Sequence, residues 1–341
     1  MNSQGNATSD GSLINIRRRT LGKPIPAEGE DGLFTQSWYA LCMSSELPAG
    51  KVLGLPFLDG RVVVFRGESG KVQVLSAYCP HLGADLAAGA VVGDNLRCSF
   101  HHWEFADSGE CTRTALGDPP PPGACLFRFP TQERYGMIWA FNGETPLFDL
   151  PDFPYPDDEL VLRVVEHEEV FPIDPWVFCC NTPDIQHIRA VHGIVFDKGD
   201  PAENMQLTDH TMMYDFDGLH GTGARIAFRV GIFGTSIFYQ SSTFDGRWYG
   251  YIAPFGMPAP GQCKVWYVLA VRKSEGDETS QQALLDFALT IQRQIVAEDA
   301  PIARGLHFKP GTLSRSDKAL ARFLEHLRKF PRAHPSADFI R

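Results

Sequence analysis

The stretch that decides the fold runs from Cys79-Pro80-His81 to Cys98-Ser99-Phe100-His101, with sixteen residues between the two halves. Each half supplies one thiolate and one imidazole from what we expect to be a tight loop between strands. Four such ligands can hold a structural zinc ion, but zinc motifs usually have two or more residues within each ligand pair. Here only Pro80 separates Cys79 from His81, so their side chains lie on the same side of an extended backbone, some distance apart. This spacing favours a binuclear cluster, with the two cysteines on one metal ion and the two histidines on the other.

The two loops resemble those of a Rieske [2Fe–2S] domain, in which two histidines replace two cysteines on one iron. The resemblance rests on Cys79-Pro80-His81-Leu82-Gly83-Ala84 and on Cys98-x-x-His101-x-Trp103. It implies an antiparallel all-β domain with a [2Fe–2S] cluster bound by Cys79, His81, Cys98 and His101. The second loop departs from the usual family pattern, because Ser99 and His102 stand where Pro and Gly are common. Spacing favours His101 over His102 as the ligand, and a structural zinc site remains the alternative.

Alternating apolar residues predict β-strands in both halves of the chain. The segments 61–66 and 71–75 predict a hairpin, and 136–141 predicts a further strand. Residues 224–272 alternate in the same way and predict an antiparallel sheet, whereas 278–305 has the three- and four-residue steps of a long amphipathic helix. These patterns predict an α+β protein with a β-rich first domain and a mixed second domain.

Changes in composition predict where the domains begin and end. Residues 1–33 are polar and rich in Gly, Ser, Pro and Glu, so we expect a disordered tail there. The proline-rich stretch 149–156 predicts a domain boundary, because proline interrupts regular structure. We therefore predict a Rieske domain over 34–150 and a catalytic domain over 151–341.

A second group of possible ligands is Asn181-x-x-Asp184-x-x-His187-x-x-x-x-His192. We expect a helix that begins near Asn181-Thr182-Pro183 and contains residues 184–192, because Asn and Thr cap helices and Pro suits an early helical position. Steps of three place Asn181, Asp184 and His187 on one helix face. His187 and His192 are five residues apart, which an ideal helix splays by about 140°. A helix end or an irregular turn would bring the two imidazoles together; an ordinary surface helix is the alternative.

The predicted helix over 278–305 offers a carboxylate to complete such a site. Its apolar face is formed by Leu284, Ala288, Ile291, Ile295 and Ile302. Asp299 falls on this face, where a carboxylate is costly unless it is paired or bound to metal. Glu298 points about 100° away and is the weaker candidate. Asp299 is therefore predicted to complete a site of two histidines and one carboxylate, as in non-haem Fe(II) oxygenases. A solvent-facing acid at the helix edge is the alternative.

Together the two groups resemble the Rieske non-haem iron oxygenases over nearly all of residues 36–330. The resemblance implies a helix-grip catalytic domain, whose curved antiparallel sheet surrounds a mononuclear Fe(II) bound by His187, His192 and Asp299. It also implies a head-to-tail homotrimer, in which Asp184 bridges His187 to His101 of the partner subunit and electrons cross between subunits. Asn181 is expected near the iron as a supporting or substrate-facing group, with a helix cap as its other possible role.

The implied activity is that of the terminal oxygenase component of a multicomponent Rieske monooxygenase. Such a protein uses O2 to hydroxylate, demethylate or desaturate a small hydrophobic, ring-containing substrate. The chain length resembles that of the shorter homotrimeric members, which favours monooxygenation over cis-dihydroxylation by an aromatic-ring dioxygenase. A stand-alone Rieske electron carrier is a further alternative, but it leaves the second domain unexplained. The sequence has no GxGxxG fingerprint, so NAD(P)H is expected to act through a partner ferredoxin or ferredoxin reductase.

Aromatic residues recur along the predicted strands of the second domain. They are Phe228, Phe233, Phe238, Tyr239, Trp248 and Tyr251. Aromatic side chains at alternating strand positions belong to a core more often than to a binding site, so no functional role is predicted for them.

The composition of the 341 residues narrows the remaining possibilities. The formal net charge of −10 argues against a nucleic-acid partner, because phosphates demand a basic surface. The sequence has no run of 18 or more apolar residues, so we expect no membrane span. Eight cysteines in a chain of this length do not describe a disulfide scaffold, and the run Arg17-Arg18-Arg19 lacks the apolar segment of an export signal. We therefore expect a reduced, cytoplasmic protein.

Overall fold

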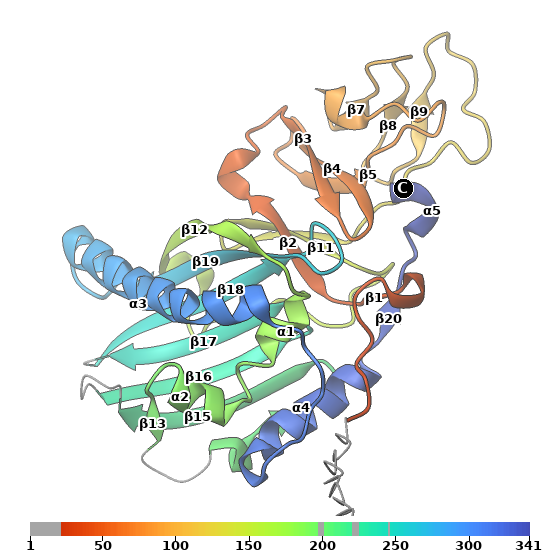
Figure 1. Cartoon of the computed structure of the whole chain (residues 1–341). Coiled ribbons are helices and arrows are strands. Elements are labelled where there is room, and N and C mark those ends of the chain that lie inside the picture. Colours follow the sequence, from red (N-terminus) through yellow and green to blue (C-terminus); the bar gives the residue numbers. More distant parts are fainter. Residues whose placement is uncertain (1–21, 197–200, 220–224, 245) are drawn as a thin grey trace, which may run out of the picture.

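The computed structural model describes residues 22–196, 201–219, 225–244 and 246–341. Figure 1 shows small sheets at one end of the molecule and a large sheet, covered by the long helix α3 (Glu278–Gly305), at the other. All strand pairs of the described residues are antiparallel. The predicted α+β class is therefore confirmed.

The prediction of a disordered tail over 1–33 is wrong for its last part. Residues 1–21 lie outside the described residues, but the segment that follows packs against the protein. The buried carboxylate of Glu28 accepts hydrogen bonds from the backbone N–H of Thr35 at 2.9 Å and from its hydroxyl at 2.7 Å. Arg332 lies 3.4 Å from the same carboxylate. Polar contacts hold this segment, and a count of apolar residues cannot reveal them.

The first part of the chain forms small antiparallel sheets around the two cluster loops. One sheet has the order β3 (Val52–Phe57), β4 (Gly60–Arg66) and β5 (Val72–Ser76). A second has the order β6 (Ala90–Val92), β7 (Asn95–Arg97), β8 (Glu104–Phe105) and β9 (Cys111–Arg113). A third has the order β10 (Thr131–Arg134), β11 (Met137–Phe141) and β2 (Trp38–Met43). The hairpin predicted over 61–66 and 71–75 and the strand predicted over 136–141 are confirmed.

The second part is built on one large sheet. Its strands run in the order β12 (Leu160–Phe171), β19 (Cys263–Arg272), β18 (Arg247–Gly256), β17 (Ile237–Phe244), β16 (Arg225–Phe233), β15 (Thr211–Leu219) and β13 (Val195–Phe196), and β14 (Gln206–Leu207) pairs with β15. Neighbours along the chain are neighbours in the sheet from β15 to β19, which is the meander that the alternation over 224–272 predicts. This sheet and the helix against it form the predicted helix-grip arrangement.

Helix α3 matches the helix predicted over 278–305, and the other helices are short. They are α1 (Pro175–Cys179), α2 (Ile185–Ala190), α4 (Lys318–Lys329) and α5 (Ala337–Ile340), with 3-10 turns η1 (Glu30–Gly32), η2 (Ser44–Glu46), η3 (Leu86–Ala88), η4 (Asp157–Glu159), η5 (Pro201–Asn204) and η6 (Arg315–Asp317). Within the described residues no helix is both long enough and apolar enough to cross a membrane. The predicted apolar face of α3 is wrong at Ile302, which is 45 % exposed. At that end of the helix the small residues Ala300 and Ala303 are buried instead.

The large sheet has a core on each of its two faces. One core packs sheet residues such as Tyr251 and Tyr267 against Leu285 and Ala288 of α3. The other packs the residues that point to the opposite face of the sheet, such as Ile252, against β2 and β11 of the first part. This alternation follows from the two-residue period of a strand, and it leaves one face of the sheet for α3 and the candidate site.

The last residues of the chain return to the first part. Strand β20 (Arg332–Ala333) pairs with β1 (Phe34–Thr35), and the Asn142 amide donates to the carbonyls of both strands. Helix α5 then packs against β4. The predicted boundary near residue 151 therefore assigns to the second domain a C-terminal segment that contacts the first.

Candidate metal centres

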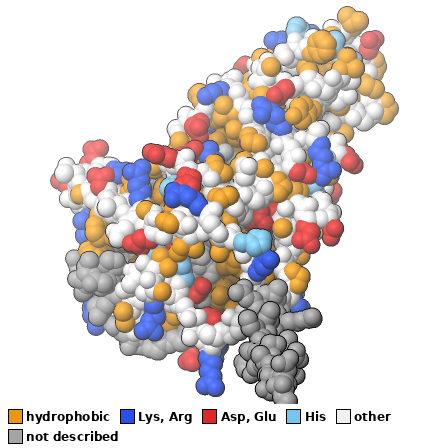
Figure 2. Space-filling model, viewed as in Figure 1, with side chains coloured by type: hydrophobic (Ala, Val, Ile, Leu, Met, Phe, Trp, Pro, Cys, Tyr) orange, Lys and Arg blue, Asp and Glu red, His pale blue; other side chains and the backbone are white. Residues whose placement is uncertain are grey.

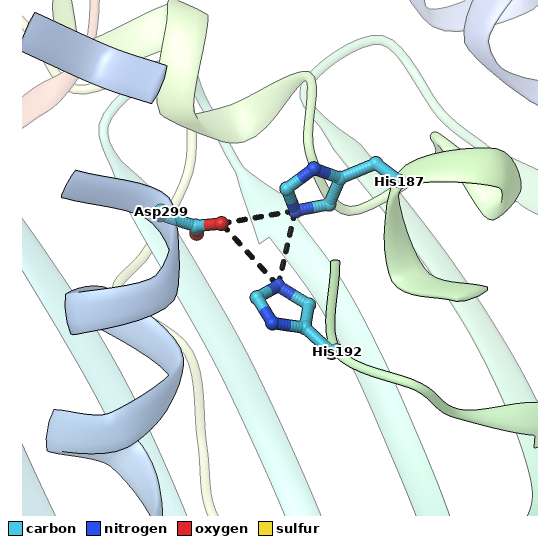
Figure 3. Close-up of side chains that lie close together, drawn as sticks. All are labelled: His187, His192 and Asp299. Atoms are coloured by element: carbon cyan, nitrogen blue, oxygen red, sulfur yellow. Dashed lines mark hydrogen bonds and ion pairs between the residues drawn. The ribbon is translucent and has the colours of Figure 1, made fainter. Parts of the chain in front are cut away.

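Three side chains predicted as iron ligands converge beside the large sheet. His187 lies on α2, His192 follows the end of that helix, and Asp299 comes from α3 (Figure 3). The two imidazole Nε2 atoms are 3.0 Å apart. Asp299 Oδ1 lies 3.2 Å from His187 Nε2 and 3.4 Å from His192 Nε2. No other set of three or more His, Cys, Asp or Glu side chains in the described residues brings all its donor atoms within 4.8 Å of one another.

The spacing of these atoms fits a single metal ion. Donor atoms about 2.1 Å from one ion and at right angles to each other lie about 3.0 Å apart. Asp299 is 8 % exposed, and its Oδ1 is buried without a hydrogen-bond donor. A buried carboxylate oxygen of this kind is costly unless a cation occupies the space in front of it. Two imidazoles and one carboxylate on one side of the space form the donor set of non-haem iron sites.

Helix α2 is shorter than predicted, and this is why the two histidines meet. The helix begins after Asp184, whose Oδ1 accepts from the His187 backbone N–H at 2.9 Å, so Asp184 rather than Asn181 is the N-cap. It ends at Ala190, and His192 lies in the turn that follows. Gly193 has a φ of 64°, a left-handed conformation that suits glycine. The prediction of a helix reaching His192 is wrong, whereas the expected helix end between the histidines is confirmed.

Two further side chains contact the ligands. Asn181 Nδ2 donates to Asp299 Oδ2 at 3.2 Å, so the residue predicted near the iron supports the carboxylate. Glu298 Oε2 lies 2.8 Å from His192 Nδ1, on the opposite side of the ring from the atom that faces the site. Glu298 was predicted only as the weaker candidate ligand, and its contact with His192 was missed. A carboxylate on the outer nitrogen fixes the tautomer and orientation of a metal-binding imidazole.

The first group of predicted ligands, which belong to the two cluster loops and are Cys79, His81, Cys98 and His101, lies at the far end of the molecule, beside β7, β8 and β9 (Figure 1). Cys79 and Cys98 are 3 % and 1 % exposed, whereas His81 is exposed and its ring lies 4.5 Å from that of His101. The backbone N–H of Cys98 donates to the carbonyl of Trp103 at 2.8 Å, and the Trp103 ring stacks on that of His81. The loops thus present two inner thiols and two outer imidazoles.

This arrangement argues against a single zinc ion at the first group. Four ligands of one zinc lie within about 4 Å of one another. The set Cys79, His81, Cys98 and His101 does not converge in this way, because no three of its donor atoms lie within 4.8 Å of each other. Two thiols on the inside and two imidazoles on the outside fit the two irons of a Rieske cluster.

Local conformation at the first group explains one unusual residue. His102 has a φ of 55°, in the left-handed region that favours glycine, and its backbone N–H donates to the carbonyl of Cys98 at 3.1 Å. This is the position where a glycine is common in the resembling loops. Burial raises the pKa of the Cys79 thiol to about 11, and the neighbouring Cys98 thiol adds to the effect. Metal binding must therefore displace protons from these thiols.

Apolar side chains are exposed around the first group. Leu82 is 66 % exposed and Phe100 is 61 % exposed, and each belongs to one of the two loops. Figure 2 shows hydrophobic side chains gathered at this end of the molecule. The eight cysteines are all free thiols, so no disulfide joins the loops.

A cavity of about 380 Å³ opens beside the three converging side chains. Its wall includes His187, His192 and Asp299 and is otherwise mostly aromatic and aliphatic. Of the six aromatic residues to which no role was assigned, Phe228, Phe238 and Tyr251 line this cavity, and Phe233, Tyr239 and Trp248 pack on the other face of the sheet. No functional role was predicted for any of the six, and the position of three of them on the cavity wall was missed. Strand register separates the two sets, and the sequence alone does not say which face carries the site.

Comparison with known proteins agrees with both metal centres. Residues 37–122 match the Rieske [2Fe-2S] domain. The cholesterol 7-desaturase of Bombyx mori is 32 % identical over 183 residues, which are 51 % of this chain and 38 % of that protein. The chain therefore contains a Rieske domain, and its relatives and structural neighbours are Rieske non-haem iron oxygenases. It spans less than half the length of curated relatives such as this desaturase.

Solved structures of Rieske oxygenases share the fold. The NdmA QL mutant of Pseudomonas putida CBB5, solved with caffeine, superposes with a TM-score of 0.67 at 21 % identity, over 86 % of this chain and 90 % of that chain. Dicamba monooxygenase bound to dicamba superposes with a TM-score of 0.64 at 21 % identity, over 86 % of this chain and 97 % of that chain. At these identities the likeness establishes the architecture and leaves the substrate open.

Proposed function

We propose that the chain is the terminal oxygenase component of a multicomponent Rieske monooxygenase. The observation that carries the proposal is the convergence of His187, His192 and Asp299 on the wall of a largely apolar cavity of about 380 Å³. The substrate is a small hydrophobic, ring-containing molecule that is hydroxylated, demethylated or desaturated. A cavity of this size and character is typical of small-molecule sites. A stand-alone electron carrier needs neither this cavity nor the second ligand set.

The proposed roles divide the ligands between two centres. His187, His192 and Asp299 hold Fe(II), which supplies oxygen activation, while Cys79, His81, Cys98 and His101 hold the [2Fe–2S] cluster. Asn181 and Glu298 keep the carboxylate and the His192 ring in position through their hydrogen bonds. The apolar wall excludes water from the substrate, which protects the reaction from side reactions.

Electrons for the reaction come from outside the chain. NAD(P)H is oxidised by a partner reductase, directly or through a ferredoxin, and the exposed His81 is the side of the cluster that such a partner reaches. The chain works in the cytoplasm in this proposal. Its assembly is a head-to-tail homotrimer, a closed cyclic arrangement in which each interface joins different surfaces of two copies.

Within that trimer, Asp184 links the two centres. Its carboxylate is half-buried beside His187, and in the proposal it also reaches His101 of the partner subunit. We predict that Asp184→Asn keeps both metal centres and loses most turnover, because asparagine caps a helix as well as aspartate does. Iron and acid-labile sulfide contents check the first half, and steady-state turnover checks the second. Unchanged turnover would remove the bridge from the proposal.

The test of the whole proposal starts from metal content. The purified protein should contain acid-labile sulfide and about three iron atoms per chain, and after reduction it should give the rhombic EPR signal of a Rieske cluster. Oxygen uptake with a surrogate reductase and a panel of hydrophobic ring compounds then separates the activities. Hydroxylated, demethylated or desaturated products support the proposal. A cis-diol product would make the chain a dioxygenase, and a colourless protein without sulfide would overturn the oxygenase assignment.

A further inference from the structure

The cavity wall has one polar region that the ligand set does not use. Some polar side chains of the wall support the ligands or the backbone: Asn181 donates to Asp299, Gln294 donates to Glu298 at 2.9 Å, and the Tyr214 hydroxyl donates to the carbonyl of Thr182. A separate polar group on the sheet and on α3 is formed by Gln240, Tyr249 and Gln292. These three are 6 %, 3 % and 4 % exposed, so each places a polar group inside a mainly apolar chamber.

The sheet holds two members of this group in fixed positions. Gln240 Nε2 donates to the hydroxyl of Ser242 at 2.7 Å and to that of Tyr249 at 3.1 Å. Ser242 on β17 is the cross-strand partner of Tyr249 on β18, so the pairing of the two strands sets these contacts. Both bonds use the nitrogen of the Gln240 amide. Its oxygen has no donor among the described residues and opens into the cavity.

Gln292 approaches the same point from the helix. It lies beside the Tyr249 hydroxyl, and its amide remains accessible from the cavity. Gln292 precedes Asp299 by seven residues on α3, which is nearly two turns. The two side chains therefore share one face of the helix, about 10 Å apart along its axis. The helix thus separates the polar group from the iron ligands by a fixed distance.

The polar group lacks a nearby partner for an anion. None of the described residues that line the cavity is Lys or Arg, and the proposed Fe(II) site lies about 10 Å away. A carboxylate or sulfate buried at the polar group would keep its charge without a neighbouring counter-ion, at high cost. The buried amides instead offer one accepting oxygen and at least one donating N–H, which together suit a hydroxyl group.

We propose that the substrate is an uncharged, elongated ring alcohol whose hydroxyl is held by Gln240, Tyr249 and Gln292, with its oxidised carbon about 10 Å away beside Asp299. This inference rests on the proposed oxygenase function and narrows its substrate class. Binding sites built to pair a substrate hydroxyl discriminate strongly against analogues that lack it, since their own polar groups are then left unpaired. Gln240, Tyr249 and Gln292 are specificity-determining residues in this view, and they do not contact the metal ligands.

The test compares four probes that share one ring skeleton: androstanol, androstane, androstanone and androstanol sulfate. Dissociation constants are measured by equilibrium dialysis against the iron-loaded protein, with iron and sulfide contents determined on the same preparation. Androstanol should bind at least about tenfold more tightly than androstane, and the sulfate should not bind measurably. Equal affinity for the alcohol and the hydrocarbon, a preference for the ketone or the sulfate, or no binding by any probe would overturn the inference. Normal iron and sulfide in the same samples would leave the proposed function standing.

Substitutions test whether Gln292 and Tyr249 cause the preference for the alcohol over the hydrocarbon. Gln292→Met is close in shape to the native side chain, and it should bring androstanol and androstane within about twofold of each other. Ile291→Met, at the neighbouring cavity position, is the matched control and should change both affinities equally. Tyr249→Phe removes a different hydrogen-bond partner of the substrate hydroxyl and is a second, independent test. An unchanged preference for the alcohol in both Gln292→Met and Tyr249→Phe would remove this group as the recognition site.

Discussion

Glu298 and Asp299 are neighbours in the sequence, yet they contact the site in different ways. Asp299 faces the two imidazoles directly, while the longer Glu298 side chain reaches the outer nitrogen of His192. The apolar period of the helix predicts the first of these, because it shows a carboxylate on a buried face. It cannot predict the second, because the reach of a flexible side chain to a ring from another element depends on tertiary packing.

We predict that Glu298→Gln weakens iron binding at the mononuclear site by about 10- to 100-fold. The amide can still accept from His192 Nδ1 but carries no charge, so the imidazole becomes a poorer ligand. Competition with a chelator, followed by iron analysis, measures the effect, while sulfide content should stay constant. Glu278→Gln at the exposed start of the same helix is the control. Equal iron retention in Glu298→Gln and this control would contradict the predicted role.

Glu28 gives a second prediction at the scale of one residue. Burial raises its pKa from 4.5 to about 7, although Arg332 and the hydrogen bonds from Thr35 act in the opposite direction. In the folded protein the group therefore holds its proton to higher pH than in the unfolded chain. The contribution of Glu28 to the free energy of unfolding is fully present below about pH 4.5 and is lost as the pH rises to about 7.

Glu28→Gln should remove this part of the pH dependence, because the amide resembles the protonated acid. Between pH 5 and pH 7 the free energy of unfolding of the native protein should fall by about 2 kcal/mol relative to that of the variant. Urea unfolding at several pH values measures both curves. Parallel curves for the two proteins would show that Glu28 does not titrate in this range.

At the scale of elements, the short helix α2 decides whether a metal site exists. Its motif spacing predicts a helix, but a regular helix through His192 would splay the two histidines. The sequence predicts that an interruption is needed, yet it does not say where. The cap at Asp184 and the left-handed Gly193 provide the answer, and both depend on backbone conformations that residue types only favour.

Gly193→Ala tests the turn after α2. Open space surrounds this position, so an added Cβ meets no atom within 4 Å and only the positive φ is disfavoured. We expect a loss of about 1 kcal/mol in the free energy of unfolding, with weaker iron binding because His192 shifts. Gly305→Ala, at a position with equal space and an ordinary φ, is the matched control and should be neutral or stabilising. Urea unfolding and iron content distinguish the two variants.

At the scale of the whole molecule, the sequence predicts the strands and loops within each part better than the contacts that join distant segments of the chain. The cluster loops, the antiparallel strands over 224–272 and the long helix over 278–305 follow from local patterns, whereas the helix-grip arrangement came from the family resemblance. The pairing of β20 with β1 does not, because it joins segments about 300 residues apart through two-residue strands that have no readable period. The hydrogen bond between Ser37 and Ser236, at 2.6 Å, likewise joins the first part to the large sheet through side chains that look like ordinary loop residues in the sequence.

The same large-scale arrangement bears on the route of electrons in the proposed oxygenase. The strands beside the cluster loops and the helix that carries His187 lie at opposite ends of the molecule (Figure 1). Electron transfer within one chain would have to cross both parts. In a head-to-tail trimer, the cluster end of one subunit can instead approach the iron end of the next, and this makes activity a property of neighbouring copies.

Co-expression of two differently tagged, inactive chains tests this route. Cys79→Ser removes the cluster and keeps the iron ligands, whereas Asp299→Asn removes the iron site and keeps the cluster. In every mixed trimer, a subunit with intact iron ligands follows a subunit with an intact cluster at one of the three interfaces. Trimers that carry both tags should therefore recover about a third of native turnover. Transfer within each chain predicts no recovery at all, so turnover no higher than that of the separate variants, in trimers verified by both tags, would exclude the route between subunits.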